Sequence, residues 1–195
     1  MARVPTVCPA AGPTDATLLD RAAAGDGAAL DELFRRHRAT AFRVAYRLLG
    51  NETDALDAVQ DGFVNALKHL SRFGGRSSFK TWLLRVVSNA ALDLGRQRKR
   101  REARVATGPA LEEATVFAPD MPADAGLERA DLRVRLEAAL AAIPEAQRQT
   151  FVLHADGGLS YREVADALGI SIGTVMSRLF YARQRLKTLL EDATP

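Results

Sequence analysis

The placement of proline constrains this chain more than any other feature of its sequence. Proline lacks a backbone N–H and clashes with the preceding turn, so it is rarely tolerated inside a helix. Of the 8 prolines, three lie in residues 1–13, three lie in 109–122, and the others are Pro144 and Pro195. Two proline-free blocks remain, 14–108 and 145–194, and each is long enough for several helices.

The first block has helical periodicity throughout. Apolar residues recur at steps of three and four from Leu30 to Leu49, and Gly50 is suited to end that helix. Further helices are predicted to begin at Asn51 and at Ser78, because both residue types cap helix N-termini. The second helix is expected to bury Leu56, Val59, Phe63, Ala66, Leu67 and Leu70. The third is expected to bury Phe79, Trp82, Leu83, Val86, Ala90 and Leu94.

The second block carries the pattern of a helix-turn-helix. Ser160 and Glu163 form a capping box, and Gly169 is suited to a left-handed turn between two short helices. Ala165 is small enough to let the second helix approach, and Val175 fills the wedge between the helices. Because no long stretch alternates apolar and polar residues, the fold class is predicted to be all-α, with two small helical domains joined by a flexible linker.

The last helix of this motif is predicted to enter the major groove of DNA. Ser171 caps it, and its first turns offer polar side chains to bases or phosphates, while later basic residues are better placed for the DNA backbone. The residues predicted to contact duplex DNA are Ser171, Thr174, Ser177, Arg178 and Arg185.

The charge distribution indicates a second contact with a polyanion. The net charge is only +3, but residues 71–104 hold ten basic and two acidic residues. Within this stretch Arg85, Asn89, Asp93, Arg96 and Arg100 lie near one helix face opposite the apolar stripe, and Asp93 is alternatively a local salt-bridge partner of Arg96 or Arg100. Such a face suits a phosphate backbone, with Asn89 reaching a base edge. Phe73, in the preceding glycine loop, is either a core residue or a support for an unstacked base.

Composition excludes several other classes of protein. The single cysteine, Cys8, excludes an internal disulfide, and His37, His69 and His154 are too far apart for a metal-ligand motif, so no metal or cofactor is predicted. The amino-terminal residues lack the apolar segment of a secretion signal, and no window is apolar enough for membrane insertion, so a cytoplasmic location is expected.

Three segments of the sequence resemble the bacterial extracytoplasmic-function sigma factors. They are DALDAVQDGFVNALKHLSRF, SSFKTWLLRVVSNAALDLGRQRKR and IPEAQRQTFVLHADGGLSYREVADALGISIGTVMSRLFYARQRL. The resemblance covers about 30–103 and 128–190, and it is specific because two unrelated motif blocks occur in the expected order. It implies a tail at 1–14, a sigma-2 domain at 15–104, an acidic linker at 105–127 and a sigma-4 domain at 128–192.

The resemblance also implies roles for individual residues. A sigma factor directs promoter-specific initiation as a binding protein and not as an enzyme, and its implied partners are core RNA polymerase, promoter DNA and an anti-sigma factor. Residues implied to dock on the clamp helices and flap of the polymerase are Asp54, Asp57, Gln60, Asp61, Phe151 and Val152. Residues implied to bind the melted -10 element are Phe73, Arg76, Ser78, Arg85, Asn89, Arg96 and Arg100. The helix-turn-helix residues given above are implied to read the -35 duplex.

Two features depart from the family pattern or lack a local explanation. Met176 and Tyr181 stand where the family often has a basic residue in the recognition helix. Gly62 lies inside a predicted helix at a cost of about 1 kcal/mol relative to alanine, which indicates close packing.

Two other functions compete with this interpretation. A self-sufficient helix-turn-helix regulator would dimerise on palindromic DNA, but it leaves residues 51–103 unexplained. An all-helical enzyme would need a catalytic constellation or a phosphate-binding glycine loop, and the sequence offers neither.

Overall fold

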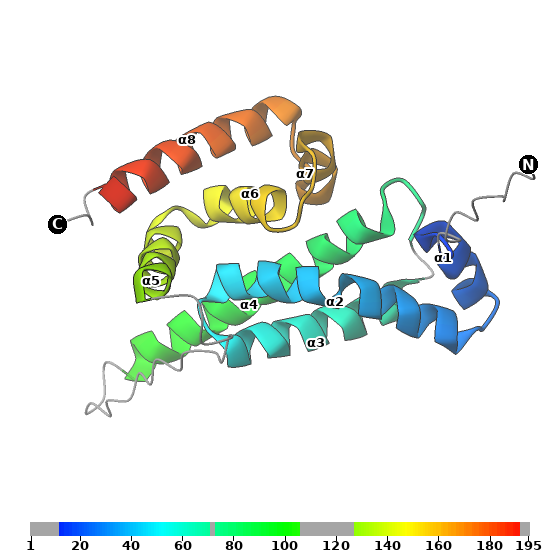
Figure 1. Ribbon diagram of the computed structural model, residues 1–195. Coiled ribbons are helices and arrows are strands. Elements are labelled where there is room, and N and C mark those ends of the chain that lie inside the picture. The colour runs from blue at the N-terminus through cyan, green and yellow to red at the C-terminus, as the bar shows by residue number, and fades with distance from the viewer. Residues whose placement is uncertain (1–11, 71–72, 106–126, 192–195) are drawn as a thin grey trace, which may run out of the picture. The chain divides into compact units, whose positions relative to one another are not determined.

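The computed structural model describes residues 12–70, 73–105 and 127–191, and every regular element within these ranges is an α-helix (Figure 1). The prediction of an all-α fold is therefore confirmed. The helices are α1 (Asp15–Ala23), α2 (Gly27–Leu49), α3 (Glu52–His69), α4 (Phe79–Val105), α5 (Leu127–Ala142), α6 (Glu145–Ala155), α7 (Tyr161–Leu168) and α8 (Ile172–Glu191).

The chain divides into two compact units, residues 1–37 and 38–195, with the boundary inside α2. Most of the predicted tail and linker, together with Cys8, lies outside the described residues. The predicted domain boundaries therefore stay predictions. Among the described residues, no helix is both long enough and apolar enough to cross a membrane.

The first unit joins α1 to the start of α2, and α1 is a helix that the apolar stripe beginning at Leu30 did not include. Leu18 is buried, as are Ala29 and Leu33 of α2. Thr14 caps α1 by accepting a hydrogen bond from the backbone N–H of Thr17. Apolar burial and a capped N-terminus together hold this short helix in place.

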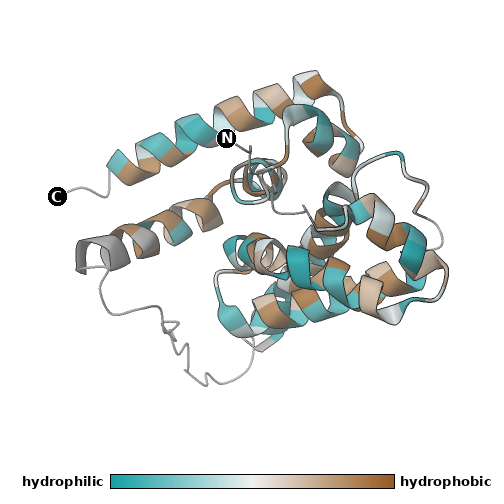
Figure 2. Cartoon of the chain, turned by 45° about the vertical axis from the view of Figure 1, so that its right-hand side comes forward, coloured by the Kyte–Doolittle hydropathy of each residue, from teal (hydrophilic) through white to brown (hydrophobic). Residues whose placement is uncertain are grey.

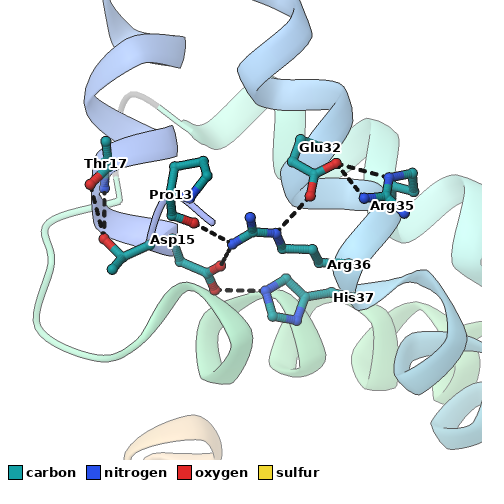
Figure 3. A network of polar contacts seen from close by, with 8 residues as sticks. Pro13, Asp15, Thr17, Glu32, Arg35, Arg36 and His37 are labelled. Carbon is teal, nitrogen blue, oxygen red and sulfur yellow. Dashed lines mark hydrogen bonds and ion pairs between the residues drawn. The ribbon is translucent and has the colours of Figure 1, made fainter. Parts of the chain in front are cut away.

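Polar contacts also connect the two helices of this unit (Figure 3). Nη1 of Arg36 donates to the backbone oxygen of Pro13 at 2.6 Å and to Oδ1 of Asp15 at 3.4 Å. Oδ2 of the same carboxylate lies 2.7 Å from Nε2 of His37. Glu32 accepts from Nε of Arg36 at 2.8 Å, and the hydrogen bonds from this guanidinium and from Arg35 hold the pKa of Glu32 below its ordinary value.

In the second unit, α3 and α4 pack together through small residues. The buried side of α3 consists of Ala55, Ala58, Val59, Gly62 and Ala66. A Cβ atom on Gly62 would lie 2.8 Å from Cγ2 and 3.0 Å from Cα of Val87, so the two helices approach closely at this point. The prediction that Leu56 and Leu67 are buried is wrong, because both are 45% exposed. The helix is rotated so that its small residues, and not these large ones, face α4.

The buried surface of α4 is broader than predicted. Phe79 and Leu83 are buried as expected, but Leu84, Val87 and Ser88 are buried as well. The reason is that α4 contacts α6 and α7 as well as α3, so more than one side of α4 is covered. Val86, Ala90 and Leu94, which were expected to be core, are only half-buried.

The predicted ends of the carboxy-terminal helices are confirmed. The capping box of Ser160 and Glu163 is present, and its backbone N–H and hydroxyl bonds from Ser160 lower the pKa of the Glu163 carboxyl. Gly169 adopts the left-handed conformation with φ of 65°. Ala165 and Val175 are buried where α7 meets α8, as a helix-turn-helix requires. A separate core cluster joins α5 to α8 through Ala139, Leu140, Ile143, Ala182 and Leu186.

Candidate nucleic-acid interface

The exposed face of α4 matches the face predicted from the sequence. Arg85, Asn89, Arg96 and Arg100 are all exposed, and they recur at steps of four, seven and four. The side chains on the opposite side, such as Val87 and Ala91, are buried, so the rotation of the helix is set by its core. The four residues form what we call the α4 polar face.

Two members of the α4 polar face also contact α6. Nε2 of Gln149 donates to Oδ1 of Asn89 and to Oγ of Ser88, each at 3.2 Å. Gln149 and Ser88 are buried, whereas Asn89 is exposed. Arg96 forms ion pairs with Asp93 and with Glu145 at the start of α6. A ligand that bonded the Asn89 amide oxygen would therefore compete with Gln149.

The glycine loop before α4 holds three of the predicted residues. The ring centroid of Phe73 lies 5.3 Å from that of Trp82 and 6.1 Å from that of Phe79, so this half-buried ring packs in an aromatic cluster. Oγ of Ser78 accepts from the backbone N–H of Thr81 at 3.1 Å and caps α4, as predicted. Arg76 is exposed between them. Phe73 and Ser78, which were predicted to bind DNA, thus also hold the two ends of the loop against α4.

The residues of the helix-turn-helix that are predicted to contact DNA lie at the start of α8 and along it. Oγ of Ser171 accepts from the backbone N–H of Thr174, and Oγ of Ser177 donates to the backbone oxygen of Thr174. Arg178 is half-buried and Arg185 is exposed. The hydroxyl groups therefore already serve the local structure of the helix.

Sequence analysis did not assign a role to an exposed apolar row on the same helix. Ile172, Met176 and Phe180 are exposed, and Tyr161 of α7 lines a hollow beside the last two. Figure 2 shows brown and teal residues interleaved along α8, the helix that leads to the C label. The signal for this row is a second set of i, i+4 apolar positions outside the buried stripe that includes Val175.

The acidic side of α3 combines charged and apolar residues. Asp57, Gln60 and Asp61 are exposed, as expected for a docking surface. Asp54 is instead engaged within the unit, since its Oδ2 accepts from Nη1 of Arg98 at 2.6 Å. Three exposed apolar residues lie on the same helix and were not predicted to be accessible: Leu56, Val64 and Leu67.

The remaining predicted docking residues lie on α6. Phe151 is half-buried against the core cluster of α5 and α8, and Val152 is fully buried. One turn earlier on the same helix, burial lowers the pKa of the Arg148 guanidinium. In the part of the chain that the structure describes, no three His, Cys, Asp or Glu side chains are placed to hold a metal ion.

Comparison with known protein families finds two separate matching regions in the chain. Residues 33–101 match the model of Sigma-70 region 2, and residues 133–186 match the model of Sigma-70 region 4. The chain is 36% identical to ECF RNA polymerase sigma factor SigE of Mycolicibacterium smegmatis, over 93% of this chain and 70% of that protein. It is 35% identical to ECF RNA polymerase sigma factor SigM of Mycobacterium tuberculosis, over 94% of this chain and 91% of that protein.

Two solved structures are similar to this chain over most of its length. The chain is similar to CnrH in its complex with the cytosolic domain of CnrY, with a TM-score of 0.69, 29% identity, and coverage of 92% of this chain and 99% of that one. It is also similar to the sigma factor RpoE of Bartonella quintana in complex with the anti-sigma factor NepR, with a TM-score of 0.66, 25% identity, and coverage of 83% and 96%.

Proposed function

The chain belongs to the extracytoplasmic-function sigma factors of RNA polymerase, and we propose that the α4 polar face and α8 contact the two elements of its promoters. Such a protein recognises promoters and directs transcription initiation. The proposed division of the chain is a sigma-2 domain at 15–104 and a sigma-4 domain at 128–192, connected by the linker at 105–127. Core RNA polymerase would hold the two domains at promoter spacing, so that two weak DNA contacts act together.

The observation that carries the proposal is the exposed α4 polar face on a helix whose opposite side is buried as far as Leu92. Arginines at three of its four positions suit the phosphate backbone, while Asn89 offers an amide to a base edge. A base extruded from the duplex costs a few kcal/mol to unstack, and contacts beside Phe73 would offset that cost. Binding, and not bond-making, is therefore the proposed mechanism, and the chain is proposed not to be an enzyme.

The partners of this chain follow from the same proposal. It would bind core RNA polymerase and promoter DNA in the cytoplasm, without inserting in a membrane. The solved complexes of CnrH with CnrY and of RpoE with NepR support an anti-sigma factor as a third partner. Run-off transcription with core RNA polymerase and genomic promoter fragments tests the function directly. Discrete start sites that require this chain are expected, and their absence contradicts the proposal.

Charge reversal on α3 tests the polymerase-binding surface. The double variant Asp57→Lys, Asp61→Lys is expected to bind core polymerase at least about tenfold more weakly, because each exposed charge pair contributes up to about 1 kcal/mol and the reversed charges repel. Asp54 is left unchanged because it pairs with Arg98 within the unit. Affinity is measured by titrating labelled sigma factor with core polymerase.

The matched control for this surface is the double variant Asp20→Lys, Asp31→Lys. It makes the same charge change at exposed carboxylates of α1 and α2. Equal weakening by both double variants would mean that net charge, and not the α3 surface, governs binding.

Replacing Asn89 tests recognition of the -10 element. For the variant Asn89→Ala, the ratio of transcription from the preferred promoter to transcription from one with a substituted -10 element is expected to fall about tenfold. The reason is that a good base contact contributes about 1–3 kcal/mol. Binding to core polymerase should not change. Run-off transcription on the two templates measures the ratio, with Asn65→Ala on α3 as the control for loss of an exposed asparagine. A ratio that Asn89→Ala leaves unchanged would exclude this residue from base recognition.

A further inference from the structure

The amino-terminal half of α8 exposes three apolar side chains in a row. Ile172, Met176 and Phe180 follow one another at steps of four and are 46%, 55% and 57% exposed. The core of the helix-turn-helix is formed instead by Val175 and Leu179, which are fully buried. The exposed row is therefore not needed for packing, and it lies on the helix proposed to enter the major groove.

The row borders an open hollow with a cationic margin. The hollow is lined by Tyr161, Met176, Phe180, Arg183, Gln184 and Lys187. The guanidinium of Arg183 donates to the hydroxyl of Tyr161 at 3.4 Å, which keeps this cation beside the apolar side chains. Apolar groups next to cations suit a ligand that presents methyl groups close to phosphates.

The neighbouring polar side chains are already engaged. Oγ of Ser171 lies 2.9 Å from Oγ1 of Thr174, and the Ser177 hydroxyl donates to the backbone oxygen of Thr174. These hydroxyls would have to share or exchange a local bond in order to contact a base. Met176, by contrast, would give up no hydrogen bond on contacting a base. Contact with an apolar group of the base would remove the exposed surface of the methionine side chain from water.

In the major groove, the C5 methyl group of thymine is the apolar group that a base edge presents. We propose that Met176 reads thymine in the -35 element by packing against this methyl group, an inference that rests on the proposed function of α8. The long, unbranched side chain of methionine can adapt to a methyl group at more than one base step. A basic residue at this position would favour phosphate or guanine instead.

The test replaces thymine by deoxyuridine, which lacks only the methyl group. Each thymine in the -35 element of a promoter found by run-off transcription is changed in turn, and holoenzyme binding is measured on matched templates. At one thymine, or at two adjacent thymines, removal of the methyl group is expected to weaken binding of wild-type holoenzyme about fourfold. This is the effect on affinity of losing one buried methyl group. In Met176→Ala holoenzyme the two templates should bind equally, and Met176→Leu should restore most of the difference.

Val134→Ala provides the matched control, because Val134 is an exposed apolar residue of α5 that lies outside the recognition helix. This variant should keep the fourfold difference. Equal binding of thymine and deoxyuridine templates by wild-type holoenzyme would overturn the proposal, as would a difference that persists in Met176→Ala or a preferred -35 element without thymine. Failure to initiate on any template would instead contradict the proposed function.

Discussion

Replacing Gly62 by alanine is expected to lower the free energy of unfolding by about 2 kcal/mol, within the range for overpacked cores. The added Cβ would lie 2.8 Å from Cγ2 and 3.0 Å from Cα of Val87, and a backbone atom cannot move aside without shifting α4. Intrinsic helix propensity alone predicts the opposite, a gain of about 1 kcal/mol. The sign of the change therefore decides between packing and propensity, and urea denaturation measures it.

Gly95 offers the matched control, because it is also a glycine inside a helix of the same unit. A Cβ on Gly95 would meet only Cδ2 of Leu49, at 3.3 Å, and the end of a leucine side chain can yield. Gly95→Ala is expected to leave the free energy of unfolding unchanged or raise it by up to about 1 kcal/mol. A stabilising Gly62→Ala would show that the close approach of α3 and α4 is not obligatory.

Removing the Gln149 amide is expected to strengthen binding of single-stranded DNA to the α4 polar face. Gln149 donates to the Asn89 amide oxygen at 3.2 Å, so a base that uses this acceptor must first displace it. In Gln149→Leu the competing donor is gone while most of the buried volume remains. One hydrogen bond contributes about 1 kcal/mol net, so the isolated chain should bind a labelled -10 non-template oligonucleotide about fivefold more tightly.

Fluorescence anisotropy measures this affinity, and Gln147→Leu is the control on the same helix. Oε1 of Gln147 has no hydrogen-bond partner among the described residues, so its replacement should not change DNA affinity. The double variant Gln149→Leu, Asn89→Ala should also show no gain over Asn89→Ala alone. A gain that survives the loss of Asn89 would mean that Gln149 acts elsewhere.

Features that depend on neighbouring residues were predictable from the sequence. The caps at Asn51, Ser78 and Ser160 were each correct, because a capping side chain bonds a backbone N–H only a few residues away. The left-handed turn at Gly169 was predicted for the same reason. These local signals set the positions of the helices, and with them the exposed side of α4.

Features that depend on distant partners were not predictable. Apolar periodicity assigned Leu56 and Leu67 to the core because it favours large residues, whereas α3 packs through small ones that permit closer approach. Ser88 is buried by α6, some 60 residues later in the chain, and its bond to Gln149 has no local signal. Similarly, the pairing of Asp54 with Arg98 could not be distinguished in sequence from an open acidic surface.

The contact of Gly62 with the backbone of Val87 has a mechanical consequence. At this point α3 has no side chain, so it lies directly against Val87, and the Asp54–Arg98 ion pair adds a second point of attachment between the two helices. Such a pair resists sliding and rotates as a stiff body. A protein that grips α3 therefore sets the orientation of Asn89 on α4 at the same time.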